Sequence, residues 1–152
     1  MTVDGFKQIL VAVDGSDNAS RAAKTAISLA KEFRAELIVC HVIQTPIYSS
    51  PEVGPYNMAN TLNEYFEVAR NESKRIVEQV KELAESDGVE AVCLIQENVF
   101  SIVEAIVNLA EERKVDLVVM GTRGRSGFKK LLMGSVSSGV LNHAHCSVLV
   151  VR

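Results

Sequence analysis

The residues best suited to chemistry in this sequence lie in one glycine-rich segment. It reads MGTRGRSGFKKLLMGSVSSG from Met120 to Gly139 and contains five of the nine glycines in the chain. Gly121, Gly124 and Gly134, followed by Ser135, have the spacing G-x2-G-x9-G-S. Because glycine lacks a Cβ, it allows the backbone to turn sharply and to approach a ligand closely. The segment therefore indicates a site where backbone groups contact a ligand.

The same segment has the groups that phosphate binding requires. Gly134 and Ser135 stand at the predicted start of a helix, whose free N–H groups and dipole attract an anion. The hydroxyls of Ser135 and Ser137 add donors. The segment also carries four cations with no acid among them: Arg123, Arg125, Lys129 and Lys130. We expect a positive site for several phosphates; the alternative is a glycine-rich turn, a capped helix and a solvated basic loop.

Two familiar phosphate motifs are absent. No glycine begins the pattern G-x-x-x-x-G-K-[S/T] of the P-loop, and the dinucleotide fingerprint G-x-G-x-x-G does not occur. No residue is obviously placed to orient an attacking water, as phosphoryl transfer requires. Asp116 opens a predicted strand at its amino end, far from the expected site. The pattern favours binding over fast chemistry.

The elements that position this segment follow from the apolar pattern. Five short, continuous runs rich in Val and Ile predict strands at 9–13, 37–42, 91–95, 117–120 and 148–151. Continuous runs are typical of strands covered on both faces, as in a parallel sheet. Between them, helical periodicity predicts helices at about 18–34, 58–86, 99–113 and 135–143, with Asn98 as the N-cap of the third. This alternation indicates an α/β fold.

Right-handed crossovers leave two leading strand orders, 2-1-3-4-5 and 3-2-1-4-5. In the second order, successive strands are added to one side of the first strand and then to the other, so the strand order reverses between the first and fourth strands. Ligands bind beyond the carboxyl ends of strands at such a switch point. The loop Asp14–Gly15–Ser16 follows the first strand, and the glycine-rich segment follows the fourth. The two most polar loops are therefore predicted to meet at one site.

Composition narrows the class of protein. The chain has 152 residues, of which 47% are apolar and 23% charged, so we expect one globular domain over 1–152. A net charge of −3 argues against general binding to nucleic acid or anionic membrane. No apolar run approaches the ~20 residues of a membrane span. We see no secretory signal, and three cysteines without a CxxC pair favour the cytoplasm.

Three other features carry alternatives. Cys40 and Cys93 lie in apolar runs and are expected in the core. The run His143, His145, Cys146 could hold a soft metal, but a helix end followed by a buried thiol is favoured. The long connection at 43–57 contains all three prolines and could be a lid or a spacer. Tyr48 and Tyr56 in it could stack on a base or anchor the loop.

The whole chain resembles the universal stress protein family. The resemblance is carried by VAVDGS at 11–16, HV at 41–42, DLVVMG at 116–121, the glycine spacing and the closing VLVV. The glycine spacing is similar to that of the nucleotide-binding branch. The resemblance implies a Rossmann-like, adenine nucleotide alpha hydrolase-like sheet of order 3-2-1-4-5, a homodimer and bound ATP or another adenine nucleotide. Mg²⁺ or Mn²⁺ would be carried by the phosphates and water.

The resemblance also assigns roles to residues. Asp14 would accept hydrogen bonds from the adenosine part, and Val42 would pack on the base. Ala12 and Val13 would line the adenine pocket, although some relatives have proline in place of Ala12. The base, ribose and phosphates would be contacted by Met120, Gly121, Arg123 and Gly124, and the phosphates by Gly134, Ser135, Val136 and Ser137. Arg125, Lys129 and Lys130 match only in being basic. Cys146–Ser147 replaces a common Cys-Pro.

Three functions compete on this reading. The favoured one is a nucleotide-dependent regulatory switch in the stress response, with a protein partner that the sequence does not name. The second is a slow ATP hydrolase or phosphotransferase, and the third is a ligand-free, chaperone-like module.

The last strand lacks charge, proline or a bulge before Arg152 and would form a sheet edge. We therefore expect a homodimer through Val148 and Val150.

Overall fold

The computed structural model describes residues 4–46, 55–122 and 133–152. Its five strands all run parallel, in the order β3-β2-β1-β4-β5, which confirms the second of the two predicted orders. The strands are β1 (Gln8–Ala12), β2 (Glu36–Gln44), β3 (Ala91–Val99), β4 (Leu117–Gly121) and β5 (Ser147–Val151). The helices are α1 (Asp17–Phe33), α2 (Pro55–Ser86), α3 (Ile102–Glu112) and α4 (Ser135–His143).

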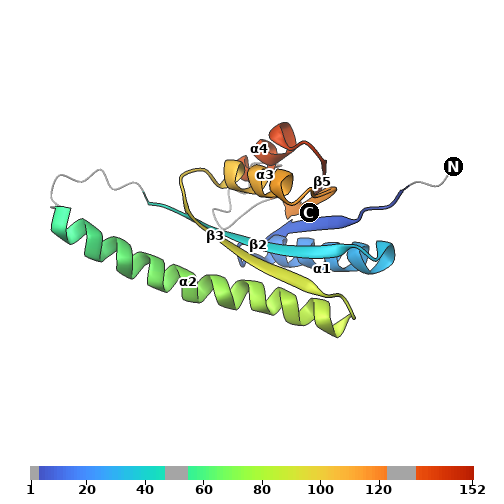
Figure 1. The fold of residues 1–152 in the computed structure, drawn as a ribbon, viewed down its shortest axis with the longest axis horizontal. Helices are drawn as coiled ribbons and strands as arrows, with labels where there is room; N and C mark the ends of the chain where they lie inside the picture. The colour runs from blue at the N-terminus through green and yellow to red at the C-terminus, as the bar shows by residue number, and fades with distance from the viewer. Residues whose placement is uncertain (1–3, 47–54, 123–132) are drawn as a thin grey trace.

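Two helices cover each face of the sheet (Figure 1). Successive side chains of a strand point to opposite faces, so Ile9 and Val11 pack with α1 and α2, whereas Leu10 packs with α3 and α4. All three side chains are fully buried. The continuous apolar strands therefore reflect two cores, one on each side of the sheet.

Helix α1 begins at a side-chain cap and lies on the sheet through small residues. Ser16 is its N-cap, and the Ser16 hydroxyl accepts a hydrogen bond from the N–H of Ala19. Its buried face consists largely of alanines, which bring the helix backbone close to the strands: Ala19, Ala22, Ala23, Ala26 and Ala30. This close contact places the start of α1 beside the carboxyl end of β4.

The predicted N-cap of the third helix is wrong. Asn98 lies inside β3 with a left-handed φ of 61°, and Ser101 caps α3 by accepting a hydrogen bond from the N–H of Glu104. Ser101 and Glu104 have the S-x-x-E spacing of a capping box, a stronger signal than a lone asparagine.

The connection predicted at 43–57 is also too long, because β2 includes Gln44 and α2 begins at Pro55. Tyr48 lies outside the described residues.

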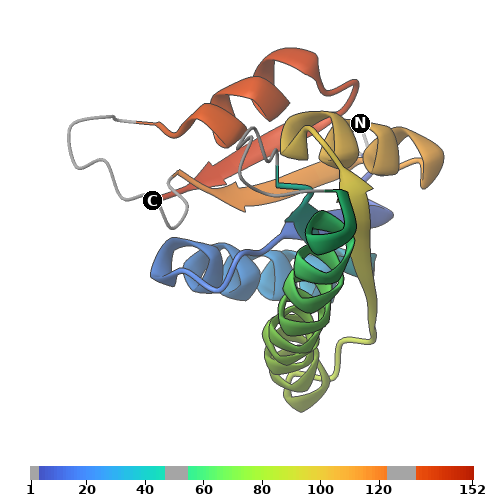
Figure 2. The same ribbon diagram turned by 90° about the vertical axis from the view of Figure 1, so that its left-hand side faces the viewer.

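Helix α2 is the longest element, but it is amphipathic. Its carboxyl half buries Ile76, Val77, Val80 and Ala84 in the core shared with α1. Within the described residues, we find no helix with the length and apolar content needed to cross a bilayer. The helix begins beside the carboxyl ends of the strands and runs back along the sheet toward the start of β3 (Figure 2).

A carboxylate joins the amino ends of two neighbouring strands. Oδ2 of Asp116, just before β4, accepts hydrogen bonds from the N–H groups of Lys7 and Gln8 at 2.7 and 2.8 Å. The N–H of Asp116 in turn donates to the carbonyl of Gln8. Asp116 therefore fixes how β1 enters the sheet, at the end opposite the crevice, as its position in the sequence predicts.

Replacing Asp116 by alanine should lower the free energy of unfolding by about 1–2 kcal/mol, since two backbone donors lose a charged acceptor. Urea unfolding measures the change. Glu112→Ala removes an exposed acid from the end of α3 and should stay within about 0.5 kcal/mol of the parent chain. Equal stability of the two variants would contradict the assigned role of Asp116.

Candidate functional site

A crevice opens where β1 and β4 part. Their pairing runs from Ile9↔Leu117 to Val11↔Val119 and then ends. Beyond that point β4 remains paired with β5, and β1 remains paired with β2. The resulting cavity has a volume of about 820 Å³, within the range of small-molecule sites. It lies at the carboxyl ends of the strands, the side that Figure 2 faces.

The predicted site residues converge on this cavity. Arg123, Gly124 and Arg125 lie outside the described residues, as do Lys129 and Lys130. Every other predicted residue lines the cavity: Ala12, Val13, Asp14, Val42, Met120, Gly121, Gly134, Ser135, Val136 and Ser137. They come from the ends of β1 and β4, from β2 and from the start of α4. The topology thus brings together four separate segments of the sequence.

The loop after β1 is a tight turn built on its own side chains. Oδ1 of Asp14 accepts a hydrogen bond from the N–H of Ser16 at 2.9 Å. Gly15 has a φ of 83°, a conformation that other residues rarely adopt. Since Ser16 caps α1, Asp14 shapes the turn instead, and it lines the crevice.

Gly121 serves packing as well as the crevice. A Cβ at this position would lie 2.9 Å from both the carbonyl carbon and the Cβ of Asn18. In the sequence, the glycine spacing predicts close approach of a ligand at Gly121. The structure adds a second reason, because the start of α1 lies directly against the end of β4.

The start of α4 faces the crevice with its backbone. Gly134 is the N-cap, and as a glycine it contributes no side-chain cap. A helix start without a side-chain cap leaves N–H groups available to an anion or to water. The hydroxyl of Ser137 lies 3.1 and 3.0 Å from the carbonyls of Thr122 and Gly134 and donates its hydrogen there. Ser137 therefore ties α4 to the end of β4 with its side chain, and it also lines the crevice.

Helix α2 forms a wall that the sequence analysis did not include. Its amino half contributes Thr61, Glu64, Tyr65, Val68, Ala69 and Glu72, and α3 adds Ile102 and Ile106. The hydroxyl of Tyr65 donates to the carbonyl of Gln44 at 3.1 Å. The sequence pattern of this segment indicates an amphipathic helix, but it does not indicate that the helix lines the crevice. Which of its turns reaches the crevice depends on how the helix crosses the sheet.

An ion pair holds the same part of α2 to β3. The guanidinium of Arg70 donates to both carboxylate oxygens of Glu97, at 2.7 and 3.0 Å. The hydrogen bond that Arg70 donates to Glu97 lowers the pKa of Glu97 and raises the pKa of Arg70. Both side chains are accessible to solvent, so the pair orients the wall more than it stabilises the fold.

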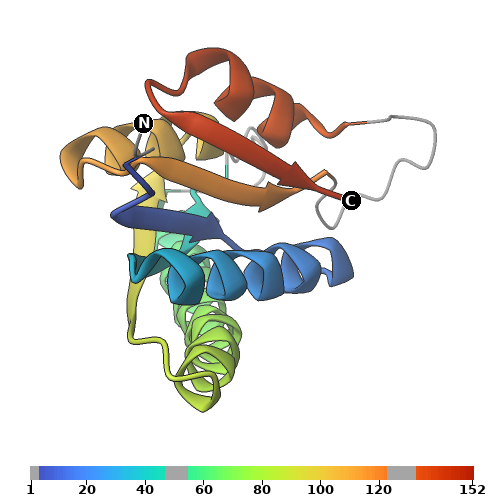
Figure 3. The ribbon, with the colours of Figure 1, turned by 90° about the vertical axis from the view of Figure 1, so that its right-hand side faces the viewer.

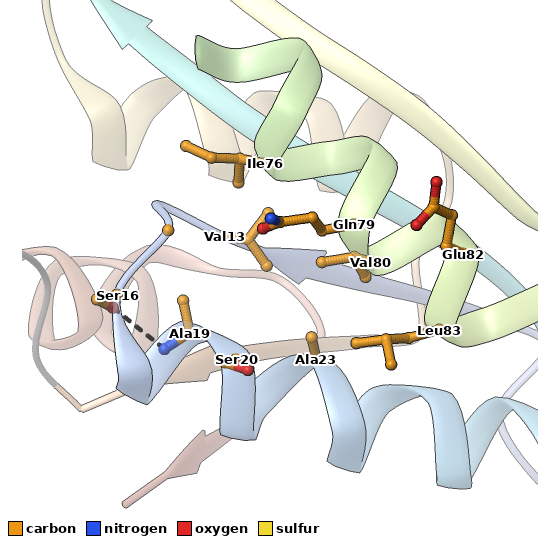
Figure 4. Close-up of a pocket in the computed structure, with 11 residues that line it drawn as sticks. Val13, Ser16, Ala19, Ser20, Ala23, Ile76, Gln79, Val80, Glu82 and Leu83 are labelled. Carbon is orange, nitrogen blue, oxygen red and sulfur yellow. Dashed lines mark hydrogen bonds between the residues drawn. The ribbon is translucent and has the colours of Figure 1, made fainter.

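A smaller hollow of about 440 Å³ lies between α1 and α2 (Figure 4). Val13 and Ala19 line both this hollow and the crevice. Its remaining walls are mostly apolar and include Ile76 and Val80, with Gln79 beside them. The turn after β1 therefore has a cavity on each side.

The cysteines and histidines give no sign of a metal centre. Among the described residues, no three His, Cys, Asp or Glu side chains are grouped to hold a metal ion. His143 contacts the carbonyl of Gly139, and His145 lies 3.8 Å from Glu111. Cys40 is fully buried, as predicted, whereas Cys93 and Cys146 are partly buried and pack against the edges of the two cores.

Thiol reactivity should follow this burial. Desolvation raises the pKa of Cys40 to about 12 and also raises the pKa of Cys93 and Cys146. Since the thiolate is the reactive form, Cys40 should react with iodoacetamide only on unfolding, after the other two. Timed alkylation at pH 8 with peptide mass spectrometry measures the order, and a urea-unfolded sample is the control. Labelling of Cys40 as fast as Cys93 in the folded chain would contradict the assignment.

Comparison with known proteins agrees with this geometry. A model of the universal stress protein family matches residues 5–152. The chain belongs to the universal stress protein family. Universal stress protein MJ0531 of Methanocaldococcus jannaschii is 38% identical over 148 residues, which cover 97% of this chain and 82% of that protein.

Solved universal stress proteins share the fold. UspA of Lactobacillus plantarum superposes with a TM-score of 0.86 at 25% identity, covering 97% of this chain and 99% of that one. A universal stress protein in complex with cAMP has a TM-score of 0.66 at 24% identity, covering 97% and 98%. One from Archaeoglobus fulgidus in complex with dAMP has a TM-score of 0.68 at 20% identity, covering 96% and 98%.

Proposed function

We propose that this chain binds an adenine nucleotide, foremost ATP, in the crevice between β1 and β4, and that nucleotide occupancy sets its regulatory state. The observation that carries the proposal is the convergence of ten predicted residues on one cavity at the switch point. The family supports it, because two solved members with this fold hold dAMP and cAMP.

The phosphates would lie at the start of α4. The N-cap Gly134 supplies no side chain to the N–H groups of the first turn, and the positive end of the helix dipole favours negative charge there. Gly134 and Ser135 line the cavity at this end, and the exposed Ser135 hydroxyl adds a donor. Mg²⁺ or Mn²⁺ bound with ATP would be held by phosphate oxygens and water.

The nucleoside would lie against the apolar part of the crevice. Val42, Met120 and Ile102 line the crevice with apolar side chains, as a purine base requires. Asp14, in the turn after β1, also lines it, and its carboxylate can accept hydrogen bonds from the ribose or the base. Each part of the nucleotide thus meets groups of matching chemistry.

A regulatory role is preferred over rapid hydrolysis. Catalysis of phosphoryl transfer needs a group that orients water or accepts its proton. The carboxylate of Asp14 accepts a hydrogen bond within its own turn, and Asp116 is used at the amino ends of the strands. Glu64 and Glu72 also line the crevice, from α2. We prefer binding because the proposed phosphate end of the crevice is formed by the start of α4 and not by these acids.

Gly134→Asp should weaken ATP binding by about tenfold or more, because it places a negative charge against the phosphates. Isothermal calorimetry with Mg²⁺ measures the affinity. Asn142→Asp adds the same charge at the far end of α4, on an exposed residue, and should bind like the parent chain.

Equal affinities of Gly134→Asp and Asn142→Asp, with the fold of both intact by circular dichroism, would reject this site. Phosphate release from the same samples distinguishes the two functions. Turnover near the ~1 s⁻¹ typical of enzymes would replace the switch by an ATP hydrolase.

We also propose a homodimer through β5. Within the described part of the chain, β5 pairs only with β4, so its second edge lies at the margin of the sheet (Figure 3). Val148 packs partly against the core, and Leu149 is 36% exposed. Two copies related by a two-fold axis would cover both apolar edges at once.

Val150→Lys should shift the chain toward monomer at roughly tens of micromolar, where a modest interface forms. Sedimentation equilibrium measures the mass. Val92→Lys is the matched control, because β3 is the opposite edge strand and Val92 is 50% exposed. A parent chain that sediments as a monomer would overturn the proposed dimer, as would equal loss of mass in both variants.

A further inference from the structure

The hydrogen-bond ladder between β1 and β2 ends at an unusual donor. Its last pair is Ala12↔Cys40, and the N–H of Val13 still donates to the carbonyl of Cys40 at 2.9 Å. In a continued parallel ladder, the carbonyl of Val13 would next accept the N–H of Val42. In this structure the ladder stops first, and Nδ1 of His41 lies 2.7 Å from the Val13 carbonyl oxygen.

The geometry determines which ring nitrogen carries the proton. A carbonyl oxygen can only accept, so Nδ1 of His41 must be the donor. The imidazole therefore takes the place of the backbone donor. The Val13 peptide is held by β2 on both its N–H and its C=O, although β1 has already separated from β4 at Val11.

Two consequences follow for the crevice. Val13 directly precedes Asp14, so fixing the Val13 carbonyl fixes the backbone from which the carboxylate turn begins. The second consequence concerns the backbone N–H of Val42. Alternate residues of a strand direct their backbone groups to the same side, so the N–H of Val42 points, like the Cys40 carbonyl, toward β1. The β1–β2 pairing has ended before Val42, and Val42 lines the crevice, so we infer that this N–H is directed to the place where a bound nucleoside would lie.

We propose that His41 is a positioning residue of the nucleotide site: its Nδ1–H replaces the last ladder donor, which orients Asp14 and releases the Val42 N–H for the nucleoside. This inference rests on the proposed function. It differs from a packing role for His41, because a packing role depends on the shape of the ring and requires no donor at the Nδ1 position.

The first experiment needs no nucleotide. ¹⁵N-labelled imidazole spectra of the full chain above pH 8 should show His41 as the Nδ1–H tautomer, with a pyridine-type Nε2. His143 also contacts a carbonyl through Nδ1, so the His41 signals are assigned by their loss in His41→Asn. A predominant Nε2–H tautomer at His41 would overturn the proposal.

The second experiment measures ATP affinity by calorimetry. His41→Leu removes the donor and should weaken binding by about tenfold. His41→Asn places an amide nitrogen at the position of Nδ1 and should restore affinity to within about threefold of the parent chain. His143→Asn is the control on α4 and should bind unchanged.

The outcomes separate the two proposals. Equal binding by His41→Leu and the parent chain, or equal weakening in His41→Leu and His41→Asn, would reject the positioning role. If His41→Leu does not fold, the ATP affinities of His41→Asn and His41→Gln are compared instead. The longer glutamine side chain moves the amide donor away from the Val13 carbonyl, so His41→Gln should bind ATP more weakly than His41→Asn. If the parent chain binds no adenine nucleotide, the proposed function fails and the positioning role fails with it. The tautomer then still reports whether His41 bonds to Val13.

Discussion

The separation of β1 from β4 after Val11 and Val119 is the constraint on which the rest of the structure depends. Up to that point β1 and β4 are paired, and their central residues are buried on both faces of the sheet. Beyond it, the backbone of each strand has lost a neighbour and must find other partners. Three polar features of the site supply such partners: the Asp14 turn, the His41 donor and the Ser137 tie.

The fold could be predicted because its determinants are local and periodic. Apolar strands such as 117–120 and the alanine face of α1 report burial directly, and right-handed crossovers restrict the order of the strands. The switch point then indicated which loops meet, which is why Asp14 and Gly134 were predicted at one cavity. The error at Asn98 arose from choosing a cap by residue type alone, without the capping-box partner that Ser101 has in Glu104.

Other parts of the site depend on information that periodicity does not contain. The crossing angle of α2 decides that Tyr65 and Val68 reach the crevice, and an angle leaves no trace in the spacing of residues. The role of His41 depends on where the ladder stops, which is a property of two strands together. Gly121 shows the same limit, because a glycine needed for helix packing and one needed for a ligand look identical in the sequence.

The two halves of α2 are held by forces of different kinds. The carboxyl half buries Ile76, Val77, Val80 and Ala84, whereas the described amino half relies on the Tyr65 hydroxyl and the solvent-accessible Arg70–Glu97 pair. Local opening costs little free energy where few apolar contacts are lost, so the helix should fray from its amino end as a separate cooperative unit. The outer wall of the crevice can therefore detach and re-form many times during the life of one folded molecule, which gives a ligand a route in and out that leaves the sheet intact.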